Sequence, residues 1–362
     1  MTRRSGSRRA LPPLLWGAGF LLAAGLLLLL RQVTGEAFYR AYIPASRAVL
    51  WALSWVFSLL PFSAAEAGIC LGVVGITGGF FYLFFRAILR GTREASRRFG
   101  RFCARVFCAA GVLVFLFFAL WGMAYGAPSL GEQMGLDVRP RAPEELAEVC
   151  TRLAGELSAA AGETERTEAG TLAPLPFRET ARSAAKAFGA YTGRSAAPAK
   201  PVLLSIPLAY TYTTGIFIDF TAEANINTVN TEAALPFVMA HEMSHRHCIA
   251  GEDEANFFAF VVLYEQGTPR ERYSALFSAW QYLALRLAET DKESYKALAS
   301  GLPPAVKADL AAYREVWNAY EQTVISDLTE KVYDAYLHVQ GESDGTKSYG
   351  NMVDLLLAYY LR

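Results

Sequence analysis

The sequence predicts a mainly α-helical membrane protein, with three N-terminal transmembrane helices followed by a large helical domain that contains a small β-sheet. Three observations support this fold class. Apolar residues make up 53% of the chain and are concentrated before residue 126, in uncharged runs long enough to cross a bilayer core. Beyond that point, apolar residues recur mostly at helical spacing. Only the stretch 205–229 alternates as a strand does.

Residues 1–125 are expected to form a membrane domain. The predicted spans cover about 11–30, 65–89 and 102–125, each near the ~20 residues that a bilayer core requires. A cleaved signal peptide is the alternative for the first span, but Arg31 follows it in place of a small-residue cleavage site. Residues 39–61 are rich in aromatic residues, and their apolar part, 48–60, is too short for a full span. We therefore expect this segment to lie in the membrane interface or to re-enter partway.

Basic residues predict the orientation. Arg3, Arg4, Arg8 and Arg9 precede the first span, and arginines dominate 90–101. Because basic loops remain cytoplasmic, we expect both segments inside and residues 126–362 on the extracytoplasmic side of the cell membrane. The lipid bilayer is therefore an expected partner of this multi-pass protein. The net charge of +0 argues against a nucleic-acid partner, and nothing in the sequence sets an oligomeric state.

The candidate functional residues form His241-Glu242-Met243-Ser244-His245, an HExxH sequence with the apolar flanks of a buried helix. Positions i and i+4 share one helix face, so His241 and His245 are expected to aim their imidazoles at one point. Two imidazoles suit Zn²⁺, and Glu242 beside them would be the general base for a zinc-bound water. Three of the 4 histidines fall within 241–247, which favours a metal site over incidental histidines on a solvated helix.

A catalytic zinc needs a third protein ligand and an open fourth position. If Gly251 separates two helices, Glu252 opens the second of them and Asn256 lies one turn further on the same face. Glu252 is the predicted third ligand, and Asn256 is expected to hydrogen-bond a ligand. Glu254 is the second choice as ligand, and His247 is the third.

The segment Glu252-Asp253-Glu254-Ala255-Asn256 resembles the ExxA[DN] sequence of the glutamate-type zinc peptidases, in which its first glutamate is the third ligand. Its short spacing from His245 is similar to that of an uncharacterised family of membrane-anchored bacterial proteins, domain of unknown function 3810. The likeness extends to residues 215–217, 220–227, 344–350 and the membrane segments. It implies a zincin-like metallopeptidase domain over 126–362 with Zn²⁺ as cofactor, and it names no substrate. Arg246 departs mildly from the peptidase pattern, because it places a charge directly after the second histidine.

Peptide hydrolysis by zinc also needs a group that stabilises the oxyanion. Glutamate-type zinc peptidases often use a late Tyr or His for this purpose, which makes Tyr349 the candidate and His338 the alternative. Packing and capping are the simpler roles for these two residues. In such peptidases an edge strand before the HExxH helix pairs with extended substrate. Part of 213–224 is expected to take this role, unless the segment is an ordinary core hairpin.

These observations predict a membrane-anchored zinc metallopeptidase that hydrolyses a peptide or protein substrate with Glu242 as general base. The alternative is a catalytically silent zinc-binding sensor or assembly factor of the cell envelope. A transporter is less consistent because the spans contain no deep charge, and an intramembrane protease is disfavoured because the HExxH sequence lies far beyond the last span. Cys150 and Cys248 could form a disulfide in an oxidising compartment, and Cys248 is also a remote candidate for a metal contact.

Overall fold

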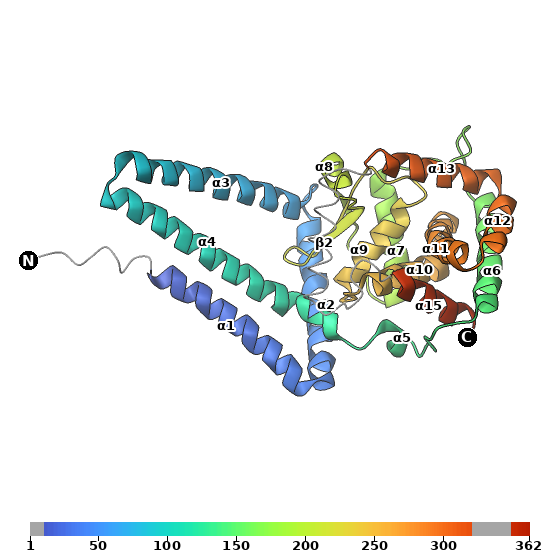
Figure 1. Cartoon of the computed structure of the whole chain (residues 1–362), viewed down its shortest axis with the longest axis horizontal. Coiled ribbons are helices and arrows are strands. Elements are labelled where there is room, and N and C mark those ends of the chain that lie inside the picture. Colours follow the sequence, from blue (N-terminus) through green and yellow to red (C-terminus); the bar gives the residue numbers. More distant parts are fainter. Residues whose placement is uncertain (1–10, 321–348) are drawn as a thin grey trace, which may run out of the picture.

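A computed structural model of the chain describes residues 11–320 and 349–362. This part of the chain is mainly helical with one small sheet, as the sequence predicts. Figure 1 shows an elongated molecule in which long helices extend from one side of a compact domain. The long helices are α1 (Leu11–Thr34), α3 (Ala64–Arg90) and α4 (Arg93–Leu120).

Three helices within the described residues are long and apolar enough to cross a membrane: Pro12–Thr34, Ala64–Arg90 and Arg93–Leu120. The third helix begins at Arg93, whereas the sequence predicts a basic loop before residue 102. Gly91 ends α3 in the left-handed region, with φ 57, and the Thr92 side chain accepts the Ala95 amide as the N-cap of α4. Arg90 is therefore the last residue of α3, and the other arginines of 90–101 lie in the first turns of α4, which ends at Leu120.

The aromatic segment after the first span is the helix α2 (Glu36–Ser58). It runs from the end of α1 to the start of α3, across the direction of the long helices (Figure 1). Side-chain contacts tie α2 to the compact domain. The Trp51 indole donates to the Ser195 carbonyl at 2.7 Å, and the Arg47 guanidinium donates to the His247 carbonyl at 2.7 Å.

The compact domain begins with η1 (Gly122–Gly126) and α5 (Leu130–Gln133), and its larger helices are α6 (Pro143–Gly162), α7 (Phe177–Thr192), α9 (Leu235–Arg246), α10 (Glu252–Gln266), α11 (Pro269–Thr290) and α15 (Tyr349–Tyr360). Shorter helices are α8 (Ser205–Ala209), α12 (Lys292–Gly301) and α13 (Pro304–Asn318). The helix α6 begins with Pro143 at its first position, which suits proline because its missing amide would have no partner inside the helix. The helices α9, α10, α11 and α15 enclose the core, in which Phe257, Phe260 and Tyr273 are completely buried.

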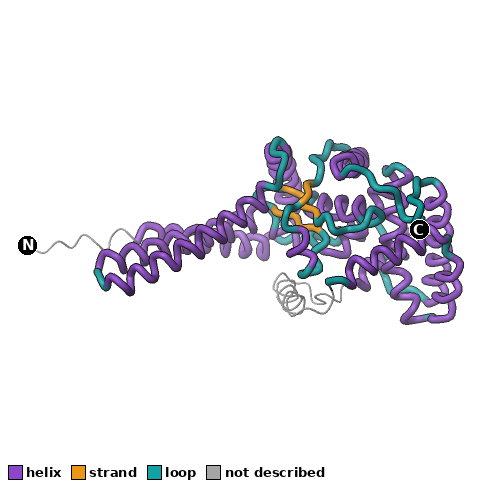
Figure 2. The backbone as a smooth tube through the Cα atoms, turned by 90° about the horizontal axis from the view of Figure 1, so that it is seen from above, coloured by secondary structure: helices purple, strands orange, loops and turns teal. Residues whose placement is uncertain are grey.

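The described residues contain one sheet, made of β1 (Lys200–Pro201), β2 (Gly215–Ile218) and β3 (Glu223–Ile226) in the order β1-β3-β2. β1 pairs with β3 in parallel, and β2 pairs with β3 antiparallel, with Gly215 opposite Ile226. β2 is therefore an edge strand of this sheet. Figure 2 shows the strands at the junction of the long helices with the compact domain. Within the predicted strand-like stretch 205–229, only β2 and β3 form a hairpin, and the first residues of the stretch form the short helix α8 (Ser205–Ala209) instead.

Candidate metal centre

The helices α9 and α10 form a hairpin that carries the candidate ligands. After α9 the Cys248 amide donates to the His245 carbonyl at 2.9 Å, and the Ile249 amide donates to the Ser244 carbonyl at 3.1 Å. This is a Schellman turn, and Cys248 takes its left-handed position with φ 61, which glycine usually fills. The turn reverses the chain at once and returns Glu252, the first residue of α10, to the end of α9. The short spacing between His245 and Glu252 is therefore sufficient to bring the Glu252 side chain back to the histidines.

The three predicted ligands meet at one point. His241 Nε2 lies 3.1 Å from His245 Nε2 and 3.2 Å from Glu252 Oε2, and His245 Nε2 lies 3.6 Å from Glu252 Oε2. Ligand atoms about 2.0–2.1 Å from a tetrahedral zinc lie about 3.3 Å from one another. The three measured distances bracket this value, so both the donor types and their spacing fit Zn²⁺.

His245 is held on two further sides. Its Nδ1 lies 2.9 Å from the Ile249 carbonyl, so Nδ1 is the donor and Nε2 is left for a metal. Trp121 donates its indole N–H to the His245 carbonyl at 2.7 Å, and its ring stands edge-to-face to the imidazole at 5.8 Å. Trp121 is not among the predicted site residues, because from the sequence it belongs to the end of the third predicted span, 102–125. His241 Nδ1 is buried and has no hydrogen-bond partner among the described residues.

The electrostatics of the cluster favour a cation. Burial lowers the pKa of His245, but the Glu252 carboxylate outweighs this effect and raises the pKa to about 9. Burial also opposes ionisation of Glu252, yet the two imidazoles hold its pKa well below the usual range. The Glu252 side chain is 28% exposed, against 12% for His241 and 7% for His245. The cluster therefore opens toward solvent on its carboxylate side.

Glu242, the predicted general base, is buried against β2. Burial raises the pKa of its carboxyl group, opposed by the charges of the neighbouring imidazoles and by a hydrogen bond from the Phe217 main chain. A Cβ at Gly215 would lie 2.6 Å from Glu242 Oε1, so only glycine leaves room for the carboxylate at this point of the strand. The edge strand β2 and the candidate base Glu242 are therefore in direct contact.

The alternatives to Glu252 point elsewhere. The Glu254 carboxylate accepts the Leu130 amide at 2.6 Å, at the start of α5, and burial raises its pKa. The His247 ring stacks on Phe258, with 5.7 Å between the ring centroids. Burial lowers the pKa of His247 to about 3, which keeps the ring neutral. Neither residue belongs to the ligand cluster in the described structure.

The charge of Arg246, which departs from the peptidase pattern, is directed into the loop before β1. Its guanidinium is buried and donates to the Ala197 carbonyl at 2.8 Å, and burial lowers its pKa to about 10. Asn256 lies one turn beyond Glu252 on α10 and is buried. Its hydrogen bond to a ligand stays a prediction.

Both cysteines of the compact domain are free thiols. Cys248 Sγ lies 3.1 Å from the Ser46 hydroxyl of α2, and Cys150 is buried 3.9 Å from the Leu283 carbonyl. The structure therefore contains no disulfide between these two residues. The left-handed turn directs the Cys248 thiol to α2, so its suggested metal contact is also wrong.

The two candidates for oxyanion stabilisation fall in or beside the undescribed segment. His338 lies outside the described residues. Tyr349 is the first residue of α15, and its side chain also lies outside what the structure describes. Both roles stay predictions.

The fold and the site define a helical protein with three helices that could span a membrane and a candidate metal centre of two histidines and a glutamate. The model of the family described as "Protein of unknown function (DUF3810)" matches residues 46–357, from within α2 to within α15. The chain belongs to this family. No curated protein and no solved structure matches it.

Proposed function

We propose that the protein is a membrane-anchored zinc metallopeptidase. The observation that carries this proposal is the convergence of His241, His245 and Glu252 at zinc-ligand spacing, with Glu242 buried beside them. A structural zinc site is normally closed by four protein ligands. The described residues supply three, and the partly exposed Glu252 leaves one side open, as a catalytic site requires.

A zinc ion held by these three residues would supply Lewis-acid chemistry and lower the pKa of a water molecule towards neutrality. Glu242 is the group placed to accept that water's proton and to deliver it to the leaving amine. Its buried position supports this role, because burial raises the carboxyl pKa towards the range in which it can both take and release a proton.

The substrate would bind as an added strand on β2. One side of β2 pairs with β3, and its other side is an edge of the described sheet. A sheet edge binds extended peptide through main-chain hydrogen bonds. The main chain at Gly215 and Phe217 touches Glu242, so a peptide aligned with β2 would pass the general base. Within the predicted segment 213–224, the residues that would pair with the substrate are thus Gly215–Ile218.

We infer that the compact domain is extracytoplasmic. The start of α1 and the turn between α3 and α4 both point away from the compact domain (Figure 1), and the turn between α3 and α4 forms the far end of the described structure. This end carries Arg90, Arg93, Arg97, Arg98 and Arg101. Basic ends of spans remain in the cytoplasm, which favours the compact domain on the opposite side.

Zinc content and peptide hydrolysis of the full chain in detergent micelles test the proposal. We expect about one zinc per chain in the wild type and in Glu242→Gln, and loss of zinc in His241→Ala. Only the wild type should hydrolyse a mixture of unstructured peptides. A wild type without zinc would refute the metal centre, and an active Glu242→Gln variant would refute the assigned base. Zinc without any hydrolysis would instead support the silent sensor or assembly factor.

A further inference from the structure

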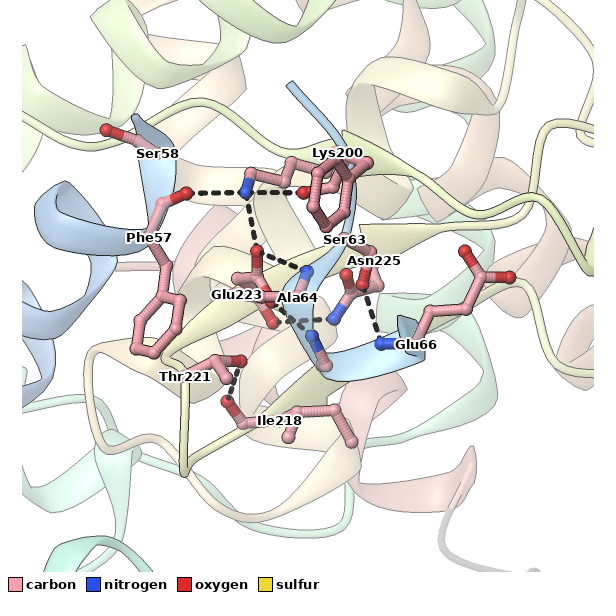
Figure 3. A network of polar contacts seen from close by, with 12 residues as sticks. Phe57, Ser58, Ser63, Ala64, Glu66, Lys200, Ile218, Thr221, Glu223 and Asn225 are labelled. Atoms are coloured by element: carbon pink, nitrogen blue, oxygen red, sulfur yellow. Dashed lines mark hydrogen bonds and ion pairs between the residues drawn. The ribbon is translucent and has the colours of Figure 1, made fainter. Parts of the chain in front are cut away.

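A buried polar network joins the sheet to the corner between α2 and α3 (Figure 3). Lys200 of β1 donates to the carbonyls of Phe57 at 2.6 Å and Phe62 at 2.8 Å. The same ammonium group pairs with the Glu223 carboxylate of β3 at 2.5 Å. The corner of the chain that leads into an apolar helix is therefore fixed directly to the sheet.

Two carboxylates extend this connection to the first turn of α3. Glu223 accepts the amides of Ala64 and Ala65 at 3.1 and 2.7 Å. Glu66 in turn accepts the amides of Leu203 and Leu204, just before α8, at 2.9 and 2.7 Å. These contacts thus hold the sheet and the segment before α8 beside the first turn of the candidate span α3.

The outer side of this junction is apolar. Leu203 is 87% exposed, Leu59 82% and Ile206 60%. Together with Leu60, Phe62 and Leu204, which are also exposed, these residues are called the junction patch. No charged residue lies between Arg47 and Glu66, or between Lys200 and Asp219. The charged groups of the junction turn inward into the polar network, while its exposed surface is made of large hydrophobic side chains.

The occupant that fits the junction patch is a lipid surface. Interfaces between soluble proteins surround their apolar centre with a polar rim. The segments of the junction patch have no charged rim of their own, and the patch continues into the exposed apolar surface of α3, a candidate span. Exposed leucine and phenylalanine beside a span suit the boundary between headgroups and acyl chains.

The candidate metal centre also lies close to the end of a candidate span. Trp121 follows the last residue of α4, contacts His245 as described above, and packs against Phe217 of β2 with 5.7 Å between the rings. β2 lies between the compact-domain ends of α3 and α4 (Figure 1). One aromatic side chain therefore separates the end of a span from both a zinc ligand and the substrate strand.

We propose that the junction patch rests in the headgroup region of the bilayer, and that the site cleaves extended segments directly beside the membrane anchor of other proteins. This inference depends on the proposed peptidase function. A segment that leaves the bilayer next to the junction patch reaches β2 at once, whereas a segment far from its anchor stays away from the edge strand. The substrate class is thus the juxtamembrane segment of a membrane-anchored protein.

The first experiment varies the distance between one cleavable sequence and its lipid anchor. The full chain is reconstituted in phosphatidylcholine vesicles with a reporter peptide anchored through about 3 or about 30 Gly/Ser residues, which place it roughly 10 or 30 Å away on average. Both substrates are confined to the membrane equally. We expect at least tenfold faster cleavage with the short spacer, and equal rates would overturn the substrate class. Absence of any cleavage, including that of the free peptide, would refute the peptidase function itself.

The second experiment tests the lipid contact without catalysis. Leu203→Cys and the control Leu285→Cys, an exposed leucine of α11, are labelled with an environment-sensitive fluorophore. Cys70, Cys103 and Cys108 are replaced by alanine in both, and the two remaining cysteines are buried. Headgroup-level nitroxide lipids should quench the label at position 203 and leave the control unchanged. Without quenching at position 203, the junction patch is covered by protein and the proposal fails, even for an active peptidase.

Discussion

Replacing Gly215 by alanine should disable Glu242 and leave the metal ligands in place. The added Cβ would lie 2.6 Å from Oε1, 2.8 Å from Cγ and 3.0 Å from Cδ of Glu242. Ordinary contact begins at 3.4 Å, so the carboxylate must withdraw by 3.4 − 2.6 = 0.8 Å, unless β2 lifts. Because a misplacement of about 1 Å costs about 100-fold in rate, we expect kcat to fall by about two orders of magnitude.

The same substitution should have a small effect on stability and none on zinc content. The clash meets a side chain that can move, so the cost should stay within the about 1–3 kcal/mol of overpacked sites. Glu242 is not a ligand, so about one zinc per chain should remain. The measurements are kcat on a fluorogenic peptide, zinc by atomic absorption, and thermal unfolding, all on the full chain in micelles.

Gly155→Ala is the matched control for this prediction. It adds the same methyl group to the exposed face of α6, where nothing lies within 4 Å of the new Cβ. Activity should not change, and stability should rise by about 1 kcal/mol, because alanine favours a helix over glycine. A Gly215→Ala enzyme whose kcat stays within about twofold of this control would show that Glu242 does not require its observed position, and the assignment of the base would fail.

Three other perturbations test the cluster and the junction. Glu252→Gln should weaken zinc binding at least tenfold, measured by competition with a chelator, while Glu254→Gln should bind zinc as the wild type does. Lys200→Met should lower the free energy of unfolding by about 3–5 kcal/mol in denaturant titrations, since it leaves Glu223 buried without its charge partner, and Lys200→Met/Glu223→Gln should recover part of the loss. Burial raises the pKa of Asp219 from 3.8 to about 7, so the folded state keeps a proton that the unfolded chain releases, and the contribution of Asp219 to stability falls as pH rises from about 4 to 7. Asp219→Asn should therefore match the wild type near pH 4 and be more stable at pH 8, and an equal difference at both pH values would contradict this.

The helices of the compact domain could be predicted because local signals define them. Pro143 begins α6, and Gly251 separates α9 from α10, as their sequence positions predict. The start of α4 could not be placed in this way. Its arginines suggest a basic loop, but arginine is a good helix former, and the cap at Thr92 lets the helix begin before the apolar run. In this region the arginines mark the expected membrane boundary, whereas the cap at Thr92 marks where the helix α4 begins.

The ligand cluster could be predicted for a related reason. His241 and His245 are one helical turn apart, and Glu252 follows after one tight reversal, so the whole ligand set is local in sequence. The groups around the cluster are not local. Trp121 reaches the His245 carbonyl across 124 residues, and Gly215 approaches Glu242 through the packing of β2 on α9. No periodic pattern encodes such contacts, because they arise only when the sheet and the helices assemble.

The contacts at the end of α9 join the candidate spans and the candidate metal centre into one structural unit. Carbonyl groups in the last turn of a helix need donors from outside that helix. Trp121 supplies one to His245 and Arg47 of α2 supplies one to His247, while Ser46 of α2 contacts Cys248 in the strained turn. All three donors or contacts precede residue 126, and all three act on the turn that returns Glu252 to the histidines. A fragment that begins at residue 126 would lose them together, so the candidate ligands are positioned by the same residues that attach the compact domain to the candidate spans.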